Sequence, residues 1–207
     1  MIPCVVVPDV LRVGTVAMPT VGPDRTVPVL HPLLASRWSP TAFDSAHVAS
    51  PTEVELLLEA ARWTPSAGNS QPWAFIVGSR GDETHCQMVD HLANSSARWA
   101  PSASLLVANL SHRYVEGTDW EYSEFSLYDL GQAVAHMTLQ ARALGLFVRQ
   151  FRAFDRARLS DAFAVPEHWE ITTLSAIGRV PTGEGSPDVP GSPSLRWRRD
   201  EITWPPT

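Results

Sequence analysis

The segment from Ser50 to Val77 constrains the fold of this chain most, because it contains a helix start, a rigid loop and a buried strand in succession. Ser50-Pro51-Thr52-Glu53 has the pattern of a capping box with proline at the first helical position. The next apolar side chains recur at the spacing of one helical face: Val54, Leu57, Leu58 and Ala61. Trp73 to Val77 then reads as a buried strand.

The loop between this helix and strand, Trp63 to Trp73, is rigid but rich in polar groups. Pro65 and Pro72 fix φ and remove two backbone donors, whereas Gly68 permits a positive φ and Asn69 tolerates one. Exposed N–H groups, hydroxyls and two carboxamides can hydrogen-bond a planar heteroaromatic ligand without bringing charge to it. An ordinary helix-to-strand turn, in which Asn69 bonds its own backbone, is the alternative interpretation.

The remaining pattern predicts an α+β fold with a central sheet of four strands and helices on both faces. Further strands are expected at 104–110, 146–151 and 171–177, and helices at 33–37, 82–94 and 126–144, with a short helix after Asp155. We expect Ser126 to cap the long helix and Gly145 to end it as a C′ glycine. On the 82–94 helix, we expect three side chains to face inward: Cys86, Val89 and Ala93.

Both ends of the chain have an unusual composition. Residues 1–30 contain five prolines and are predicted to form an N-terminal arm that packs on a partner subunit. From about residue 180 the chain contains six prolines and three glycines, which predicts an extended tail that crosses a neighbouring subunit. Residues 111–125 are rich in aromatic side chains and form either a lid over a pocket or part of a dimer interface.

Composition argues against several classes of protein. The net charge of −6 and the absence of a basic cluster before the tail favour neither nucleic acid nor an anionic membrane as partner. No apolar run approaches the length of a membrane span, no basic region precedes the apolar N-terminus, and Cys4 and Cys86 are far apart, so we expect a cytoplasmic protein. The chain has no lysine, which disfavours Walker-type, Schiff-base and kinase chemistry. Motifs for a metal site, a nucleophile elbow and a Rossmann dinucleotide site are absent.

Four segments, in order and at suitable distances, together resemble the flavin-binding signature of the nitroreductase family. The first is the Arg-x-Ser-x-x-x-Phe pattern within 36–44, and the second is Pro-Ser-x-x-Asn-x-Gln-Pro-Trp at 65–73. The third, 128–133, opens the long helix, and the fourth, 150–155, resembles the family's loop at the flavin edge. The resemblance extends from about residue 31 to about residue 202.

This resemblance implies a central, mostly antiparallel sheet flanked by helices, in a domain at 31–207 whose C-terminal tail is exchanged in a homodimer. It implies FMN as cofactor, NADPH or NADH as transient reductant, and a small-molecule substrate. The expected reaction is ping-pong hydride transfer through flavin N5 to an electron-poor acceptor such as a nitroaromatic, quinone or enone. Two alternatives are a flavin-dependent dehydrogenase of a biosynthetic intermediate and a non-catalytic protein that sequesters FMN.

The resemblance also assigns individual residues to the cofactor, and none of them acts as a catalytic acid or base. The phosphate is expected at Arg37 and Ser39, in a segment that includes Trp38 and Thr41, with Arg198 or, second, Arg196 from the tail. The remaining cofactor contacts are assigned to the ring and ribityl chain, the first three from the opposite subunit: Pro65, Ser66, Ala67, Asn69, Gln71, Arg152 and Ala153.

Two positions depart from the family pattern. Thr41 stands where a basic residue near the phosphate is common, which makes the tail arginines more important. Ala153 stands where glycine is usual in the loop whose backbone N–H groups face flavin N5 and O4. Alanine keeps the N–H but disfavours a positive φ, so this departure affects the loop conformation rather than its donor.

Overall fold

The computed structural model describes residues 30–181, and every structural statement below concerns these residues. The N-terminal arm up to residue 29 and the tail from residue 182, with Arg196 and Arg198, lie outside them. Among the helices in this part of the chain, none has the length and apolar character that crossing a membrane requires.

Four strands form one sheet, as the sequence predicts: β1 (Trp73–Ser79), β2 (Leu105–His112), β3 (Phe147–Phe151) and β4 (Trp169–Gly178). Their order is β1-β2-β4-β3, and all three pairings are antiparallel. β2 occupies the middle because its residues are buried from Leu105 to Ser111, which is the burial that a strand covered on both faces requires.

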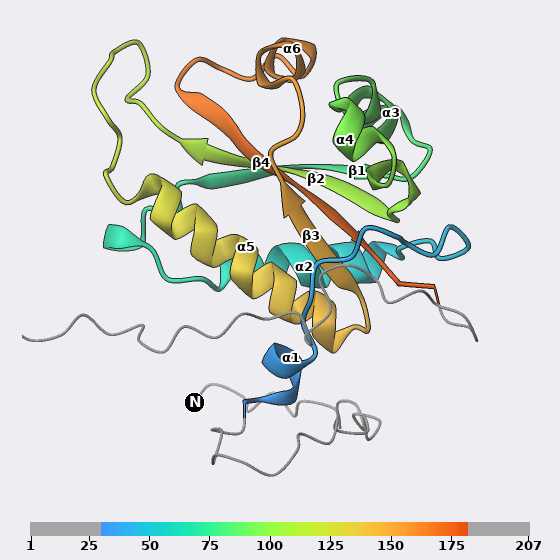
Figure 1. Ribbon diagram of the computed structural model, residues 1–207. Coiled ribbons are helices and arrows are strands. Elements are labelled where there is room, and N and C mark those ends of the chain that lie inside the picture. The colour runs from blue at the N-terminus through green and yellow to red at the C-terminus, as the bar shows by residue number, and fades with distance from the viewer. Residues whose placement is uncertain (1–29, 182–207) are drawn as a thin grey trace, which may run out of the picture.

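Helices cover both faces of this sheet (Figure 1). α2 (Pro51–Arg62) and α5 (Ser126–Ala143) lie on one face, and α3 (Glu83–Asp90), α4 (Asn94–Ala97) and α6 (Arg156–Ala162) on the other. The short α1 (Pro32–Ala35) lies beside α5. Successive β2 side chains point to opposite faces: Leu105 and Val107 join the core under α2 and α5, and Leu106 and Ala108 join the core under α3 and α6.

The predicted ends of α2 and α5 are largely confirmed. Ser50 Oγ accepts from Glu53 N at 3.2 Å and Glu53 Oε2 accepts from Ser50 N at 2.7 Å, which completes the capping box. Gly145, at φ 76°, follows the last turn of α5 as the C′ residue. The prediction that Ser126 caps α5 is wrong: Phe125 is the N-cap, and Ser126 is a buried first-turn residue whose hydroxyl donates to Ser123 O.

The helix predicted at 82–94 is shorter than expected. α3 ends at Asp90, and the chain begins the separate α4 at Asn94. The prediction of inward-facing Cys86 and Ala93 is wrong, since both are exposed, whereas His85 and Met88 are buried. Apolar spacing alone placed the buried face one position out of register, because it did not count His85 as a core residue.

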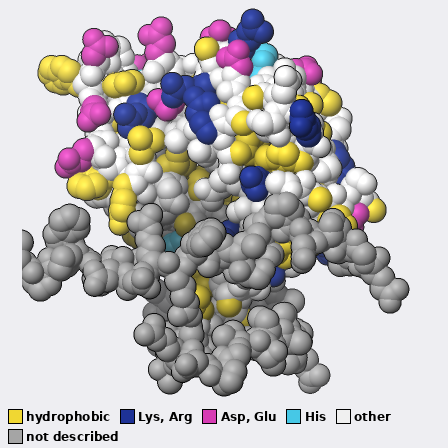
Figure 2. Space-filling model, in the orientation of Figure 1, with side chains coloured by type: hydrophobic (Ala, Val, Ile, Leu, Met, Phe, Trp, Pro, Cys, Tyr) yellow, Lys and Arg dark blue, Asp and Glu magenta, His cyan; other side chains and the backbone are white. Residues whose placement is uncertain are grey.

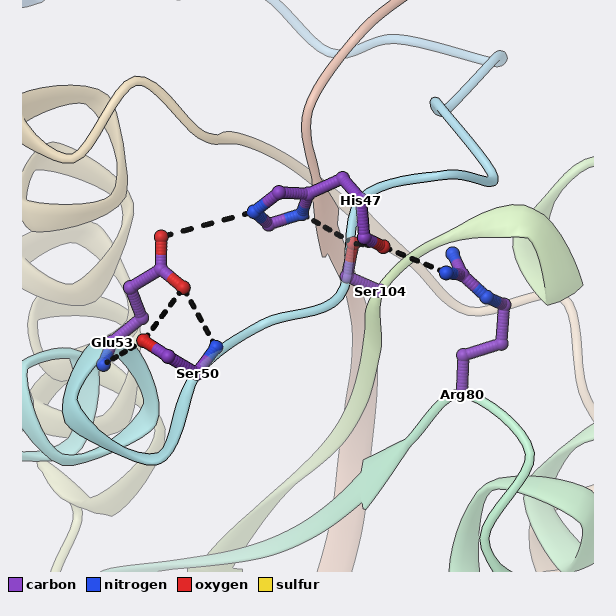
Figure 3. A network of polar contacts seen from close by, with 5 residues as sticks. All are labelled: His47, Ser50, Glu53, Arg80 and Ser104. Carbon is purple, nitrogen blue, oxygen red and sulfur yellow. Dashed lines mark hydrogen bonds and ion pairs between the residues drawn. The ribbon is translucent and has the colours of Figure 1, made fainter.

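A polar network fixes the start of α2 to the end of the sheet (Figure 3). His47 Nδ1 lies 2.8 Å from Ser104 Oγ, and His47 Nε2 lies 3.8 Å from Glu53 Oε1. Ser104 Oγ and Arg80 both donate to the His47 carbonyl, at 3.0 and 2.7 Å. Because the Ser104 hydroxyl is 2% exposed and its proton is directed to a carbonyl, this Ser–His–Glu arrangement is structural and does not present a nucleophile.

Candidate functional site

Arg37 and Ser39 line a cavity between α5 and the edge strand β3. The cavity measures about 450 Å³. Arg37 Nη1 donates to Ser39 Oγ at 3.3 Å, so the guanidinium and the hydroxyl face the same space. The rest of the lining comes from α1, α5 and β3: Leu34, Ala135, Thr138, Leu139, Val148 and Gln150. A cationic fork with a hydroxyl beside it suits an anionic group such as a phosphate.

The other residues of this segment anchor it. Trp38 packs its ring against Phe147 with centroids 5.2 Å apart. Thr41 is half-buried, and its side chain makes no hydrogen bond within residues 30–181. The segment crosses the edge of β3, because Val148 and Gln150 line the cavity while Arg149, on the opposite face of the strand, donates to Ser39 O at 2.9 Å.

The Pro65 to Gln71 loop has the backbone conformation that its glycine and asparagine predict. A 3-10 turn spans Ala67–Asn69, and φ is 58° at Gly68 and 56° at Asn69. Gln71 also has a positive φ, 47°, which the sequence did not predict. The Ser66 hydroxyl accepts from Gln71 N at 2.9 Å, and the Gln71 amide donates to Asn69 Oδ1 at 3.2 Å. Positive φ at non-glycine residues persists only where surrounding contacts enforce it.

Asp129 supplies one of those contacts, and the sequence analysis did not single it out as a site residue. Its carboxylate, 2% exposed, accepts from Ala67 N at 3.0 Å. With Gln132 and Tyr128 it lines a second, smaller cavity of about 260 Å³ that also includes Pro65 and Ser66. Two signals could have pointed to it: its place in the 128–133 segment that resembles the family pattern, and its acidic side chain in the first turn of α5.

Within one chain, the Arg37 cavity and the Pro65 loop do not meet. No residue lines both cavities, but on α5 their nearest lining residues are Ala135 and Gln132, which are three positions or about 4.5 Å of helix rise apart. Two residues near the centre of α5 are small and exposed, Gly131 and Ala135.

The Arg152–Ala153 loop follows β3 directly. The Arg152 guanidinium turns back over the Phe154 ring, 4.6 Å from its centroid, and donates to Phe154 O. Ala153 O accepts from Ala93 N and from Ser96 Oγ, but the Ala153 N–H makes no backbone hydrogen bond within residues 30–181. This part of the loop therefore retains a donor for a ligand.

The aromatic segment after β2 is anchored at its base. His112 stacks between Tyr122 and Trp169, with centroids 3.8 and 4.8 Å away. Burial lowers the pKa of His112, and the neighbouring His168 lowers it further. Trp120 at the tip of the segment is 77% exposed. Both interpretations of the segment, a lid and an interface, require such an exposed aromatic residue.

Another hollow in the described residues is larger than either of these two cavities. It measures about 630 Å³ between α2 and the edge of β1 and is lined by Pro51, Val54, Leu58, Arg62 and Val77, among others. None of the residues that the sequence assigned to a ligand lies there. Size alone therefore does not identify the site, and we give more weight to the Arg37 cavity because of its donors.

The chain is similar in sequence to several known proteins. The model described as "Nitroreductase family" matches residues 34–106. The 5,6-dimethylbenzimidazole synthase of Rhodospirillum rubrum is 28% identical over 147 residues, covering 60% of this chain and 70% of that protein. The oxygen-insensitive NADPH nitroreductase of Helicobacter pylori is 44% identical over 50 residues, 24% of each protein.

The fold gives a broader match than the family model. A solved structure described as an oxidoreductase containing FMN is 27% identical, with a TM-score of 0.70 over 80% of this chain and 84% of that one. A putative NADH dehydrogenase/NAD(P)H nitroreductase of Bacteroides thetaiotaomicron, 18% identical, has the same fold, with a TM-score of 0.65. The motifs, the antiparallel sheet and these matches together show an oxidoreductase that is similar to the nitroreductase family, whose model matches about a third of the chain.

Proposed function

We propose that this chain is an FMN-dependent oxidoreductase that transfers hydride between NAD(P)H and an electron-poor small molecule. The observation that carries the proposal is the cavity at Arg37 and Ser39, which borders β3 just before a loop whose Ala153 N–H has no backbone acceptor among residues 30–181. A phosphate at one end and a ring edge at the other would use both features.

The residues present fit such a cofactor. Arg37 and Ser39 would bind the phosphate, and Arg198 or Arg196 of the tail would add a second cation. Ala153 N–H would donate to the N5–O4 edge, where negative charge increases on reduction. When bound, flavin supplies two-electron hydride chemistry that none of these side chains could supply alone. The protein's part is to bind, orient and shield it from water.

The homodimer is part of this proposal, because a second copy would join the two separate cavities. Two α5 helices packed antiparallel around Ala135 would bring the N-terminal half of one beside the C-terminal half of the other. The Pro65 loop of one copy, including Asn69 and Gln71, would then cover the Arg37 cavity of its partner. Support comes from the small outward residues at the centre of α5 and from exposed Leu127 and Tyr128 beside them. Exchange of the C-terminal tail would close the same slot.

The side chains on the described part of the surface in Figure 2 are of the kinds that such an interface would use. Arginine and acidic side chains are interspersed there, and hydrophobic side chains are exposed between them. Exposed hydrophobic residues also include Leu34, next to the Arg37 cavity. An interface that combines apolar contacts with a polar rim suits this composition.

A biosynthetic role is the second candidate. It is favoured by the length of the match to the 5,6-dimethylbenzimidazole synthase, which spans 147 residues. The nitroreductase match is shorter, although its identity is higher. A dehydrogenase or synthase of this kind would use the same flavin slot but would not need to accept nitroaromatic compounds or quinones.

The test begins with the absorbance spectrum of the purified protein. We expect a flavin spectrum that is bleached anaerobically by NADPH or NADH and returns when a nitroaromatic or a quinone is added. Arg37→Ala should lose FMN on gel filtration, whereas Arg156→Ala, on the distant α6, should retain it. A colourless protein that takes up no added FMN would refute the proposal, and a yellow protein that no nicotinamide reduces would favour the biosynthetic or the sequestering alternative.

A further inference from the structure

Two arginines outside the predicted site contact the Ser36–Ser39 segment, one at each end of it. Arg142, at the end of α5, donates from Nη2 to Ser36 Oγ at 3.3 Å and from Nη1 to Leu146 O at 3.1 Å. Arg149, on β3, donates from Nη1 to Ser39 O at 2.9 Å. Together they place two guanidinium groups beside the segment that carries Arg37.

Neither arginine is neutralised by a carboxylate within residues 30–181. Other arginines there are ion-paired, such as Arg156 with Glu170 at 2.6 Å, but the partners of Arg142 and Arg149 are carbonyls, a hydroxyl and aromatic rings. Both side chains are half-buried, and the Nε of each is buried with no hydrogen-bond partner in the described part of the chain.

Such cations are costly to bury. Removing a charge from water is unfavourable unless an opposite charge compensates it, and burial accordingly lowers the pKa of Arg142. The Arg142 guanidinium lies 3.9 Å from the Phe147 ring centroid and that of Arg149 5.1 Å from the Trp99 centroid, and these cation–π contacts offset part of the cost. The remaining cost would be recovered by an anion bound next to the segment.

We propose that Arg142 and Arg149 are positioning residues that hold the Ser36–Ser39 segment in its anion-binding shape and supply positive potential for the FMN phosphate. This inference rests on the proposed flavin function. It also explains how the site tolerates Thr41, because two neighbouring elements bring the positive charge that a basic residue at that position would otherwise supply. A phosphate monoester carries nearly two negative charges at neutral pH, so it gains most from such a field.

The test compares FMN with riboflavin, which has the same ring but no phosphate. For Arg149→Met and Arg142→Met, we expect the Kd of FMN to rise about tenfold each, while that of riboflavin changes less than about twofold. Arg149→Lys and Arg142→Lys keep the charge and should recover much of the FMN preference. The salt dependence of FMN binding should become weaker in the Met variants and remain close to that of the unmodified protein in the Lys variants.

The matched control is Arg156→Met, which also removes an arginine but lies on α6, away from the Ser36–Ser39 segment, and is paired with Glu170. It should leave both dissociation constants unchanged. Equal weakening of FMN and riboflavin binding by the Met variants would overturn the inference, as would unchanged FMN binding. If the Met variants do not fold, the Lys variants and the salt dependence of the unmodified protein still test the inference. FMN binding by the unmodified protein that does not depend on salt would also overturn the inference. If the unmodified protein binds neither flavin, the proposed function itself fails.

Discussion

The buried carboxylate of Asp129 accepts a hydrogen bond from the backbone N–H of Ala67 at 3.0 Å, which ties α5 to the Pro65 loop. This contact helps to hold a loop with three positive φ angles in one conformation. The same helix extends to Thr138 in the Arg37 cavity. α5 therefore carries residues of both cavities and fixes their spacing.

Removing this contact should loosen the loop. We expect Asp129→Ala to lower the free energy of unfolding by about 1–3 kcal/mol, because the Ala67 N–H loses its acceptor. Flavin binding should weaken as well. Asp129→Asn keeps an acceptor oxygen, so it should lower both the free energy of unfolding and the flavin affinity less than Asp129→Ala does. Urea unfolding and flavin titration provide the measurements, and equal behaviour of the two variants would contradict this role.

Gly78 is predicted to be intolerant of any side chain. A Cβ at this position would lie 2.5 Å from His85 N and 2.7 Å from His85 Cα, so β1 and α3 would have to separate. We expect Gly78→Ala to destabilise the protein by about 1–3 kcal/mol in urea unfolding. Ser79→Ala, at the next position of the same strand, is the control and should change stability by less than about 0.5 kcal/mol. A neutral Gly78→Ala variant would show that α3 can move away freely.

Stability should fall as the pH falls below about 6.5, the ordinary histidine pKa. Burial is the largest cause that lowers the pKa of His47, His85 and His112 in the folded protein. The unfolded chain therefore takes up protons first, so the stabilisation is complete above pH 6.5 and is lost as the pH falls towards the folded-state pKa values. Urea unfolding from pH 7.5 to 5 measures this slope.

His85 allows that explanation to be checked at one site. The residue is 4% exposed, and its Nε2 is buried with no hydrogen-bond partner among the residues that the structure describes. His85→Leu should flatten the decline of stability between about pH 6.5 and 5, since a leucine takes up no proton. A slope identical to that of the unmodified protein would mean that His85 does not contribute.

The proposed dimer predicts that the centre of α5 is sensitive to bulk and charge. We expect Ala135→Arg to give monomers that bind flavin weakly, because a charged side chain would stand where two helices meet. Ala97→Arg adds the same charge on exposed α4 and should preserve both the assembly and the bound flavin. Sedimentation velocity with absorbance at the flavin wavelength follows both properties. A dimeric, fully loaded Ala135→Arg protein would move the interface elsewhere.

Local signals predicted most of the fold. The capping box at Ser50, the glycine at 145 and the apolar runs of the four strands depend on interactions between near neighbours, which a sequence displays directly. The errors arose where distant contacts decided the outcome. His85 is buried because α3 packs closely on Gly78, and Cys86 is consequently exposed.

The sequence by itself determined the order of the elements, the antiparallel α+β class suggested by its motifs, and the left-handed turn at Gly68 and Asn69, because each is encoded by residues close together in the chain. Only the tertiary structure decided that Asp129 holds the Pro65 loop, that Arg142 and Arg149 contact the Arg37 segment, and that different residues of α5 line the two cavities. Those relationships join residues separated by 60 or more positions for Asp129 and by more than 100 for the two arginines. They arise from the way α5 and β3 pack, which no local pattern records.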